Sequence, residues 1–585
     1  MAQSPTVDTT TMNMEASGRI YKSLPEGCIR VVRIQPGLEA DDIVCRLEQP
    51  KLLSDSPSYE ALSYAWGTCD ATEYIYLGNE RLEKFSVSPS LALALRMLRG
   101  TEAEVTMWID AICINQANNA ERAEQVKLMG EIYRSAERVV AFLGAHEDGS
   151  QELFQFLKDW KGEIDISRFD DAWQAGAAER PLLSRSYWQR AWIVQELVLA
   201  SHKYLQCGKD RISFSALESF HAGMVCEPIE RTIPITHPSR HVVDAGYSNT
   251  WHSRFDQLIS TDPSISIDSF LNGFLESQCK DPRDHIYAFY NLLPRELKRH
   301  ININYDTGAV EVICQAVQAM MTATRSLKII TLRSRQTSPE QEWQDSLPSW
   351  CPFLGVPYMD PPRSSGDLRV DNPTFSFSRD GKFLHVKGIV HGKICDRLPR
   401  FPPANRPFEP LKAKHVARLF YERNYAYECI QFMKESGLCG DVDLNERVLG
   451  KALDARPGDN LISYLERTKG RRRPRFSGSQ IAQMSNFSQS FHGMQLCMFV
   501  VDAPSTRHDE EEVTIWVDFA IVPRAARNGD RICAIQGCEQ LVVLRNVCQG
   551  RRFYRVIGEA RVCSNTGDQI ISQAPVSSLK TFTLI

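Results

Sequence analysis

The clearest pattern of hydrophobic and polar positions in this sequence lies between residues 105 and 143. A β-rich run at 105–109 and a loop precede apolar side chains at every third or fourth position: Val126, Met129, Ile132, Tyr133, Ala136 and Val140. This spacing is that of an amphipathic helix. Asn118 can cap its first turn, with Glu121 three residues later as in a capping box. A second β-rich run follows at 139–143, so the order of elements predicts a parallel βαβ crossover.

Other segments continue an α/β pattern. Apolar runs at 29–47 and 74–77 predict strands, and residues 90–98 and 188–200 have the composition of helices. A mostly helical pattern covers 250–330, clearest at 309–321, and returns at 410–470. Alternating apolar positions predict hairpin strands at 372–395 and a terminal run of strands at 494–501, 514–522, 530–535, 540–544 and 553–557.

These elements divide the chain into four parts. We expect a disordered tail at 1–18, an α/β domain at 19–220, a mostly helical region at 221–371, and a β-rich C-terminal module at 372–585 that carries a helical insertion around 400–490. A chain of 585 residues is long enough for several cores, so no metal or disulfide is needed for stability.

Charge and composition narrow the classes of function. The chain has 68 basic and 72 acidic side chains, and this balance argues against a dedicated nucleic-acid binder. No apolar run approaches the roughly 20 residues that span a bilayer, and the polar N-terminus lacks a signal peptide. The 17 cysteines include no C-x-x-C pair, which is typical of reduced thiols in the cytosol. We therefore expect a cytoplasmic protein that binds neither nucleic acid nor membrane. The basic run at 469–475 is either a solvated loop or an anion-binding or nuclear-import patch.

Several common catalytic motifs are missing from the sequence. The 13 histidines form no H-E-x-x-H motif and no paired Cys/His spacing, so no metal is expected. The phosphate-binding G-x-x-x-x-G-K-[ST] loop, the dinucleotide-binding G-x-G-x-x-G fingerprint and the G-x-S-x-G elbow are missing too. No resident cofactor is therefore expected.

Three blocks of the sequence resemble the heterokaryon incompatibility (HET) domain of filamentous fungi in their order and spacing. They lie at 59–67 (YEALSYAWG), at 108–144, which begins WIDAICINQ, and at 188–197 (WQRAWIVQEL). The resemblance continues more loosely at 281–288, 347–350, 529–530 and 543–545, whereas 396–490 matches nothing that we recognise. It implies a factor in heterokaryon incompatibility, non-self recognition and regulated cell death.

HET domains have in turn been likened to TIR domains, which are flavodoxin-like signalling modules. Many TIR domains carry W-C-x-x-E-L on a helix, and that Glu is catalytic in the members that cleave NAD. Residues 192–197 of this chain read W-I-V-Q-E-L, so the match falls on Glu196, with Ile193 in place of the Cys. Ser63 and Tyr64 resemble the Ser-Tyr at the end of an early TIR strand. The resemblance implies a TIR-like parallel sheet in the N-terminal domain and NAD as a potential substrate.

The candidate site gathers residues that follow the predicted parallel strands, because ligands bind beyond the carboxyl ends of strands in such sheets. Glu196 is the candidate catalytic residue, since a carboxylate suits the oxocarbenium-like state of nicotinamide–ribose cleavage. Trp66 could stack on a planar ring. The candidate ligand-binding residues are Ser63, Tyr64, Trp66, Asp110, Gln116 and Trp192.

Structural roles for the same residues remain open. Glu196 could cap a backbone group or pair with Arg190 or Arg122. Asp110 could bind loop amides as an Asx-turn. Both tryptophans of the candidate site could simply fill the core.

Three hypotheses for function follow. In the first, the chain is a HET-domain incompatibility factor whose remaining two-thirds restrain the domain or sense a partner. That partner is another incompatibility protein, or a second copy bound through the HET domain. In the second, the chain is an NAD glycohydrolase that uses Glu196. In the third, it is a non-catalytic interaction module or an accessory protein of a metabolic gene cluster.

Overall fold

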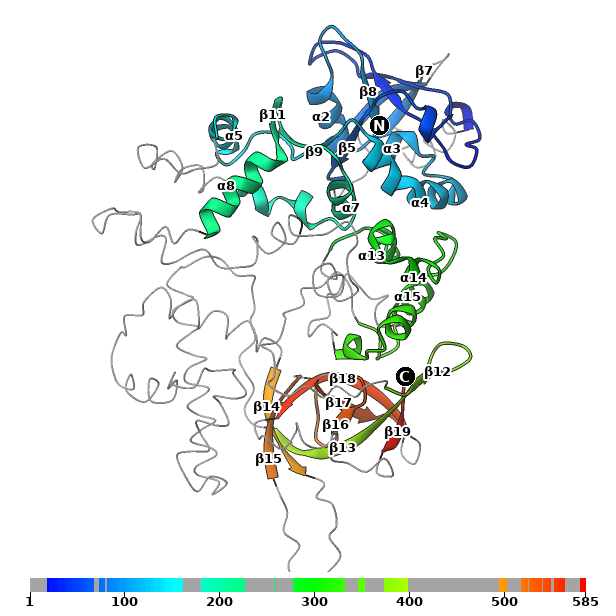
Figure 1. The fold of residues 1–585 in the computed structure, drawn as a ribbon, viewed down its shortest axis with the longest axis vertical. Helices are drawn as coiled ribbons and strands as arrows, with labels where there is room; N and C mark the ends of the chain where they lie inside the picture. The colour runs from blue at the N-terminus through cyan, green and yellow to red at the C-terminus, as the bar shows by residue number, and fades with distance from the viewer. Residues whose placement is uncertain are drawn as a thin grey trace, which may run out of the picture. The chain divides into compact units, whose positions relative to one another are not determined.

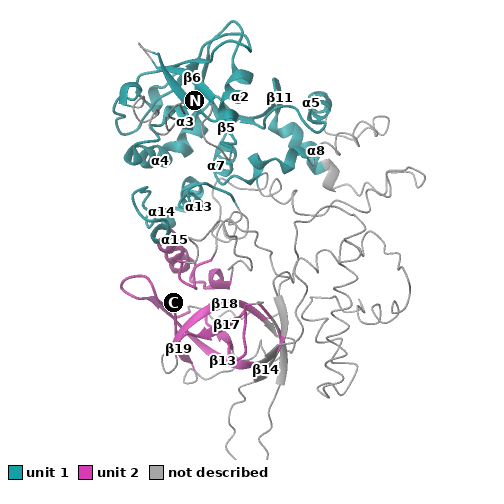
Figure 2. Ribbon diagram, turned by 180° about the vertical axis from the view of Figure 1, so that it is seen from behind, with its two compact units in different colours: residues 1–233, 249–312 teal, residues 234–248, 313–585 magenta. Residues whose placement is uncertain are grey.

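The structure is a computed structural model in which most of the N-terminal half and a C-terminal set of strands are described (Figure 1). The described residues are 18–67, 73–78, 82–160, 179, 181–226, 258, 277–331, 346–352, 373–397, 494–501, 517–523, 525–538, 540–548, 552–562 and 579–585. The chain forms two compact units, coloured separately in Figure 2. The first unit comprises residues 1–233 and 249–312, and the second comprises 234–248 and 313–585.

Within the described residues, the first unit is built on a nine-stranded sheet of order β11-β10-β9-β5-β8-β2-β3-β6-β7. Its strands are β2 (Val32–Ile34), β3 (Val44–Leu47), β5 (Glu60–Tyr64), β6 (Glu73–Gly78), β7 (Leu82–Val87), β8 (Val105–Trp108), β9 (Arg138–Phe142), β10 (Lys203–Cys207) and β11 (Asp210–Ser213). Two short strands, β1 (Cys28–Ile29) and β4 (Lys51–Leu52), pair antiparallel beside it.

The strand directions correct the expectation of a parallel sheet, because the sheet is mixed. Four adjacent strands, in the order β8-β5-β9-β10, run parallel to one another. Strand β2 is antiparallel to β3 and β8, and the hairpins β6–β7 and β10–β11 are antiparallel. Short connections such as these two hairpins can only return the chain antiparallel, whereas a parallel neighbour needs a long crossover. The predicted βαβ crossover is confirmed: β8 and β9 both run parallel to β5, which lies between them.

The described helices of the first unit include α2 (Pro89–Leu98), α3 (Asp110–Cys113), α4 (Asn119–Ser135), α5 (Ser150–Lys158), α7 (Ile193–Val198) and α8 (Phe214–Cys226). Helices α2 and α4 form where the sequence predicts them, whereas α3, α5 and α8 were not predicted. The predicted cap of α4 is confirmed, since the Asn118 side chain accepts the N–H groups of Ala120 and Glu121. Helix α2 contacts β5 and β6, whereas α7 contacts β5, β9 and α4.

Two local predictions were wrong. Residues 188–200 do not form one helix: a 3-10 turn, η3 (Ser186–Gln189), is separated from α7 by extended backbone at Arg190. The break arises because Arg190 forms a parallel bridge with Gln278, a residue remote in sequence. The capping box also fails, because Glu121 accepts the N–H of Asn115 instead of an N–H at the cap.

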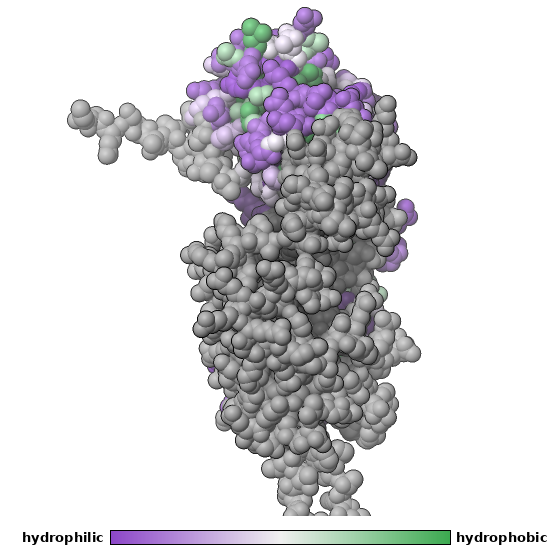
Figure 3. All heavy atoms as spheres, turned by 90° about the vertical axis from the view of Figure 1, so that its left-hand side faces the viewer, coloured by the Kyte–Doolittle hydropathy of each residue, from purple (hydrophilic) through white to green (hydrophobic). Residues whose placement is uncertain are grey.

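A run of short helices ends the first unit and leads into the second. It comprises α13 (Asp284–Tyr287), the 3-10 turn η4 (Tyr290–Leu292), α14 (Arg295–Lys298) and α15 (Ala309–Thr324). The predicted helix at 309–321 is therefore confirmed. On the face drawn in Figure 3, hydrophilic residues predominate on the described surface and hydrophobic ones form small separate patches.

The second unit contains a β-rich sheet, as predicted, and its described strands close into a barrel. The strands are β12 (Phe375–Phe377), β13 (Leu384–Arg397), β14 (Met494–Val501), β15 (Val517–Pro523), β16 (Arg531–Ile535), β17 (Leu541–Asn546), β18 (Phe553–Val562) and β19 (Lys580–Leu584). Pairing runs along β13-β14-β15-β18-β17-β16, and β16 pairs back to β13. Closure removes the edges of these strands. The strand β19 was not predicted, and the expected helical segments at 400–490 and the basic run at 469–475 lie outside the described residues.

The loosely HET-like segments of the second unit have structural roles. Asp530 is buried, and its carboxylate accepts two hydrogen bonds from the Arg545 guanidinium at 2.9 and 2.8 Å. Trp350 is also buried and donates its indole N–H to the carbonyl of Lys382 at 3.1 Å. The Ser349 hydroxyl accepts the N–H of Val556 in β18 at 2.9 Å. These contacts tie residues 347–350 and 529–530 to the barrel.

Candidate functional site

A buried hydroxyl–carboxylate group joins the first and third HET-like blocks. Ser63 lies near the carboxyl end of β5, and Glu196 lies on α7, which packs against that strand. The Ser63 hydroxyl donates a short hydrogen bond to Oε2 of Glu196. The same hydroxyl lies 2.8 Å from the hydroxyl of Tyr187, and the Tyr133 hydroxyl from α4 also reaches the Glu196 carboxylate. Hydroxyl groups from a strand (Ser63) and from a helix (Tyr133) therefore meet at the Glu196 carboxylate.

The electrostatic state of Glu196 is set mainly by burial. Loss of water contact raises the pKa of Glu196 to about 7, although the Arg190 guanidinium opposes the rise. The Asp110 carboxylate adds repulsion, and the Ser63 hydrogen bond lowers the pKa again. Near neutral pH, Glu196 is thus close to the point where it gains or loses a proton.

Arg190 places a positive charge between the three blocks. Its guanidinium donates to the carbonyl oxygen of Tyr64 at the end of β5. It also attracts the carboxylates of Glu196 and Asp110, and it lowers the pKa of both. Arg190 thus attracts Glu196 within the cluster, and an ion pair of Glu196 with Arg190 or Arg122 stays a prediction.

Asp110 binds a nearby backbone amide, but this amide belongs to the next residue and not to the residue two positions on that an Asx-turn requires. It begins α3 directly after β8, and its Oδ1 accepts the N–H of Ala111 at 2.7 Å. Its Oδ2 accepts the indole N–H of Trp66 at 3.0 Å. Gln116 lies beside it and donates its side-chain amide to the Asp110 carbonyl at 2.9 Å. Desolvation raises the pKa of Asp110 above its usual value.

The two tryptophans of the candidate site behave differently. Trp66 is 39% exposed, so it is not a core residue, and its bond to Asp110 fixes the ring at the surface beside the cluster. Trp192 instead donates its indole N–H to Asp284 at 3.1 Å. The structure therefore brings Ser63, Tyr64, Trp66, Asp110, Gln116 and Glu196 to one end of the parallel strands, whereas the polar contact of Trp192 lies with Asp284.

Access to the carboxylate decides what chemistry the cluster can perform. Glu196 and Ser63 are each 1% exposed, and Tyr187, which is hydrogen-bonded to Ser63, is buried to the same degree. A catalytic carboxylate must come within hydrogen-bonding reach of a substrate. In this arrangement a substrate would reach Glu196 only after α7 or η3 moves. The observed state is that of a closed polar core and not of an open active site.

Sequence reasoning missed a second buried ion pair in the HET-like region. Arg30 is 1% exposed, and its guanidinium binds both carboxylate oxygens of Glu121, at 2.6 and 3.1 Å. It also donates to the carbonyl oxygens of Cys113 and Lys22. Arg30 lies outside the three blocks and 91 residues from Glu121, so no local pattern could have revealed this pair.

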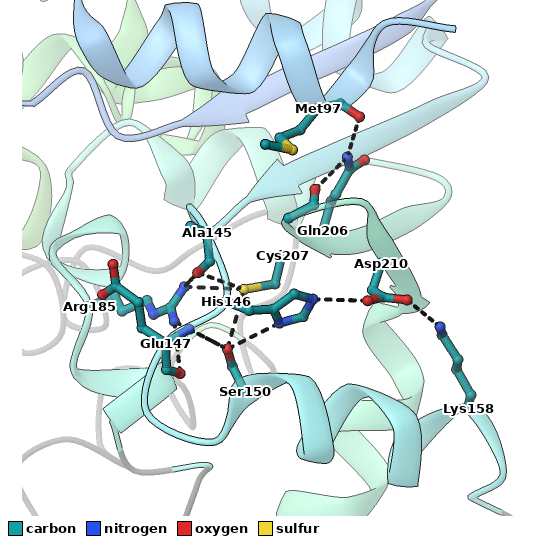
Figure 4. A network of polar contacts seen from close by, with 11 residues as sticks. Met97, Ala145, His146, Glu147, Ser150, Lys158, Arg185, Gln206, Cys207 and Asp210 are labelled. Carbon is teal, nitrogen blue, oxygen red and sulfur yellow. Dashed lines mark hydrogen bonds and ion pairs between the residues drawn. The ribbon is translucent and has the colours of Figure 1, made fainter. Parts of the chain in front are cut away.

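A separate Ser–His–Asp network lies near the ends of β9 and β10 (Figure 4). The Ser150 hydroxyl lies 3.2 Å from Nδ1 of His146, and Nε2 of His146 lies 3.0 Å from Oδ2 of Asp210. However, Ser150 is 1% exposed and its hydroxyl also accepts the N–H of Glu147. Asp210 shares its carboxylate with Lys158. This network ties the loop after β9 to the β10–β11 hairpin, and it resembles a catalytic triad only in its residue types.

Among the described residues, no group of three or more His, Cys, Asp or Glu side chains is arranged to hold a metal ion. No helix in the same part of the chain is long and apolar enough to cross a membrane.

The fold and the site together define a mixed α/β domain whose three sequence blocks meet in one buried polar cluster. Residues 59–196, which span those blocks, match the family described as heterokaryon incompatibility protein (HET). This segment of the chain is therefore similar to the HET domain.

A curated relative extends the likeness beyond this domain. Heterokaryon incompatibility protein 6, OR allele, of Neurospora crassa is 25% identical to this chain over 422 residues. The match covers 60% of this chain and 61% of that protein, so the chain spans less than two thirds of the relative's length. No solved structure matches the chain.

Proposed function

We propose that this chain acts in heterokaryon incompatibility and that its HET domain triggers regulated cell death on recognition of non-self. The match of residues 59–196 to the HET family and the likeness to an incompatibility protein support this proposal. One observation carries it furthest: Ser63, Asp110 and Glu196, from three separate blocks, share a single buried cluster. A cluster of this kind couples the blocks, so that a change at one is felt by the others.

The partner in this proposal is another incompatibility protein or a second copy of the HET domain. The exposed Trp66 beside the cluster gives such a partner an aromatic contact next to the buried charges. Nucleic acid and membrane are not part of the proposal.

Growth of Neurospora crassa strains that express the full chain tests the proposal. We expect cell death in at least one incompatible genetic background and normal growth in compatible ones. Glu196→Gln should weaken the response, whereas Glu124→Gln, at a carboxylate that is 52% exposed on α4, should not. Normal growth in every background would contradict a role in incompatibility.

A second candidate function is cleavage of NAD between nicotinamide and ribose. The four parallel strands lie in the order β8-β5-β9-β10. Numbered along the chain as one to four, this order is 2-1-3-4, which is the order of the first four strands in flavodoxin-like sheets. This order and the position of Glu196 beyond β5 support a TIR-like interpretation. In such a reaction water attacks the ribose carbon, nicotinamide leaves, and Glu196 stabilises the positive charge that develops on the sugar.

Loss of NAD in solutions of the purified full chain separates the enzyme from the non-catalytic alternative. Because Glu196 is 1% exposed, we expect slow turnover or none by the resting protein. Turnover that Glu196→Gln abolishes and Glu124→Gln retains would favour the enzyme. Turnover that persists unchanged in Glu196→Gln would show that Glu196 is not the catalyst. No turnover in cells that nevertheless die would favour a HET domain that acts by binding.

A further inference from the structure

Residues 277–307, called the clasp from here on, lie outside the family match yet pack against the HET domain. The match ends at residue 196, and the clasp follows it in the same compact unit. Figures 1 and 2 show α13 and α14, which belong to the clasp, beside α7 and α4. Several of its apolar side chains are buried: Ile286, Tyr287, Ala288, Phe289, Leu292, Leu293 and Leu297.

On its α7 side, the clasp holds the segment that carries Glu196. The backbone N–H of Gln278 donates to the Gln189 carbonyl at 2.7 Å, and its carbonyl accepts the N–H of Ala191 at 2.9 Å. These bonds hold the break between η3 and α7. The indole of Trp192, at the start of α7, donates to Asp284.

One clasp residue reaches the position next to Glu196. The side-chain amide of Asn291 donates to Oε1 of Gln195 at 3.1 Å and to the carbonyl of Val126 in α4 at 3.0 Å. Gln195 is fully buried. Asn291 thus links α4 to α7 at the residue adjacent to Glu196.

On its α4 side, the clasp fits a helix surface that lacks a side chain at one position. Gly130 lies opposite Asn291, and a Cβ atom on Gly130 would lie 2.7 Å from the Asn291 Cβ. Further along α4, the Arg122 guanidinium lies 3.8 Å from the centre of the Tyr305 ring. Glycine in the middle of a helix costs stability relative to alanine, so Gly130 is useful only if the close approach of the clasp is needed.

The clasp is also braced internally by charged groups. Asp281 binds the Arg283 guanidinium at 2.7 Å, and Arg283 donates to the carbonyls of Tyr305 and Thr307. The Tyr305 hydroxyl donates to Asp284 at 2.9 Å. Its two ends are therefore held together while its middle contacts α4 and α7.

We propose that the clasp is a releasable restraint that holds α7 against β5 and keeps Glu196 away from water. When the clasp is in place, the Ser63–Glu196 group is closed; when it lifts, α7 loses its contacts at Ala191, Trp192 and Gln195, and Glu196 becomes accessible. The inference rests on the proposed function only in assigning importance to Glu196. The contact itself is testable without any assay of incompatibility.

Hydrogen–deuterium exchange of the full chain tests the clasp directly through Gly130→Ala. The added methyl group must push Asn291 away, so we expect the amides of α7 to exchange about tenfold faster. Gly308→Ala is the matched control, because a Cβ atom there meets nothing within 4 Å. Alanine alone should slow exchange in α4, the helix that carries residue 130, since it favours the helix over glycine. Faster exchange in α7 therefore reports the lost contact with the clasp, whereas unchanged exchange in α7 indicates a neutral surface.

A second variant keeps the test decisive if Gly130→Ala fails to fold. Asn291→Ala removes the hydrogen bonds to Gln195 and Val126 without adding bulk, and it should also speed exchange in α7. Unchanged or slower exchange in α7 for both folded variants would overturn the proposal. Faster exchange without any change in cell death would support the clasp and count against the proposed function alone.

Discussion

At the residue scale, Glu196 is an acid kept in the protein interior by a few polar neighbours. The Ser63 hydroxyl donates to it and Arg190 supplies a positive charge, yet desolvation still raises its pKa to about 7. The pKa of Asp284, at the other side of the start of α7, is also raised to about 7, chiefly by burial and by the nearby Asp281. The protein is therefore more stable when these two side chains are protonated than when they are ionised.

The resulting pH dependence has a definite sign. An acid whose pKa is higher in the folded state stabilises the fold at low pH and loses that stabilisation as the pH rises. We therefore expect Glu196 to lower the free energy of unfolding as the pH rises from about 4.5 to 7. Glu196→Gln should remove this contribution and stabilise the protein at pH 8 by up to about 3 kcal/mol. Urea unfolding at several pH values measures it, and the raised pKa values of Asp110 and Asp284 contribute to the dependence that remains.

Arg30 provides a second prediction at this scale. Replacement by methionine leaves the Glu121 carboxylate without its bidentate partner and should cost about 3–5 kcal/mol in unfolding free energy. Arg33→Met is the matched control, because Arg33 pairs with Glu48 while its side chain is 42% exposed, and such pairs contribute about 1 kcal/mol or less. Equal effects of the two substitutions on urea unfolding would contradict the structural role of Arg30.

The sequence could indicate some of these residues but not their neighbours. Ser63, Asp110 and Glu196 follow predicted strands or lie on a motif helix, so their convergence was expected from the sheet. Tyr187 and Tyr133 were not expected in the cluster, because a tyrosine in an apolar stripe carries no sign of where its hydroxyl points. Arg30 could not be found at all, since its partner lies in a different element.

At the element scale, the sequence predicted helices correctly where contacts between neighbouring residues determine where the helix begins. Helices α2 and α4 begin at Ser88 and Asn118, whose side chains satisfy free N–H groups of the first turn, and both helices were predicted. The helix at 188–200 was predicted wrongly because a remote backbone bridge at Gln278 extends the chain at Arg190. Pairings between remote segments are not encoded in the periodicity of either one.

The cap of α4 yields a prediction for this scale. Asn118→Ala removes the acceptor for the N–H groups of Ala120 and Glu121, at 3.1 and 3.2 Å, and should cost about 1 kcal/mol. Asn118→Asp keeps an acceptor at the same position and should retain most of the stability. Circular dichroism during urea unfolding measures both. If Asn118→Asp loses as much stability as Asn118→Ala, the side-chain oxygen is not the cap.

At the scale of the whole molecule, the class of each half was predictable and the architecture was not. Alternating apolar positions indicated the strands of the second unit, but closure of the barrel depends on pairing between β13 and β16, which are far apart in sequence. In the first sheet, the antiparallel pairing of β2 with β8 was missed for the same reason, since these strands are also far apart in sequence. The predicted boundaries at 220 and 371 stay a prediction, and the compact units divide elsewhere, near residue 312.

The buried pair Asp530–Arg545 gives a prediction for the second unit. Asp530→Ala leaves Arg545 without its carboxylate and frees the N–H of Arg527, which Asp530 accepts at 2.7 Å. We expect the unit to lose about 3 kcal/mol and the amides of β16 to exchange faster. Asp380→Ala, on an exposed turn of the same unit, should leave β16 unchanged. Slow exchange of β16 in Asp530→Ala would show that the pair is dispensable.

The central claim is that the first and third HET-like blocks act as one unit through the contact between Ser63 and Glu196. A double-mutant cycle on the full chain, with Ser63→Ala and Glu196→Gln alone and together, measures that contact by urea unfolding at constant pH. We expect a coupling energy of about 1–2 kcal/mol. The exposed pair Ser58 and Glu137, joined at 2.9 Å, should show no measurable coupling when treated in the same way. Additive effects at Ser63 and Glu196, within about 0.3 kcal/mol, would contradict the claim.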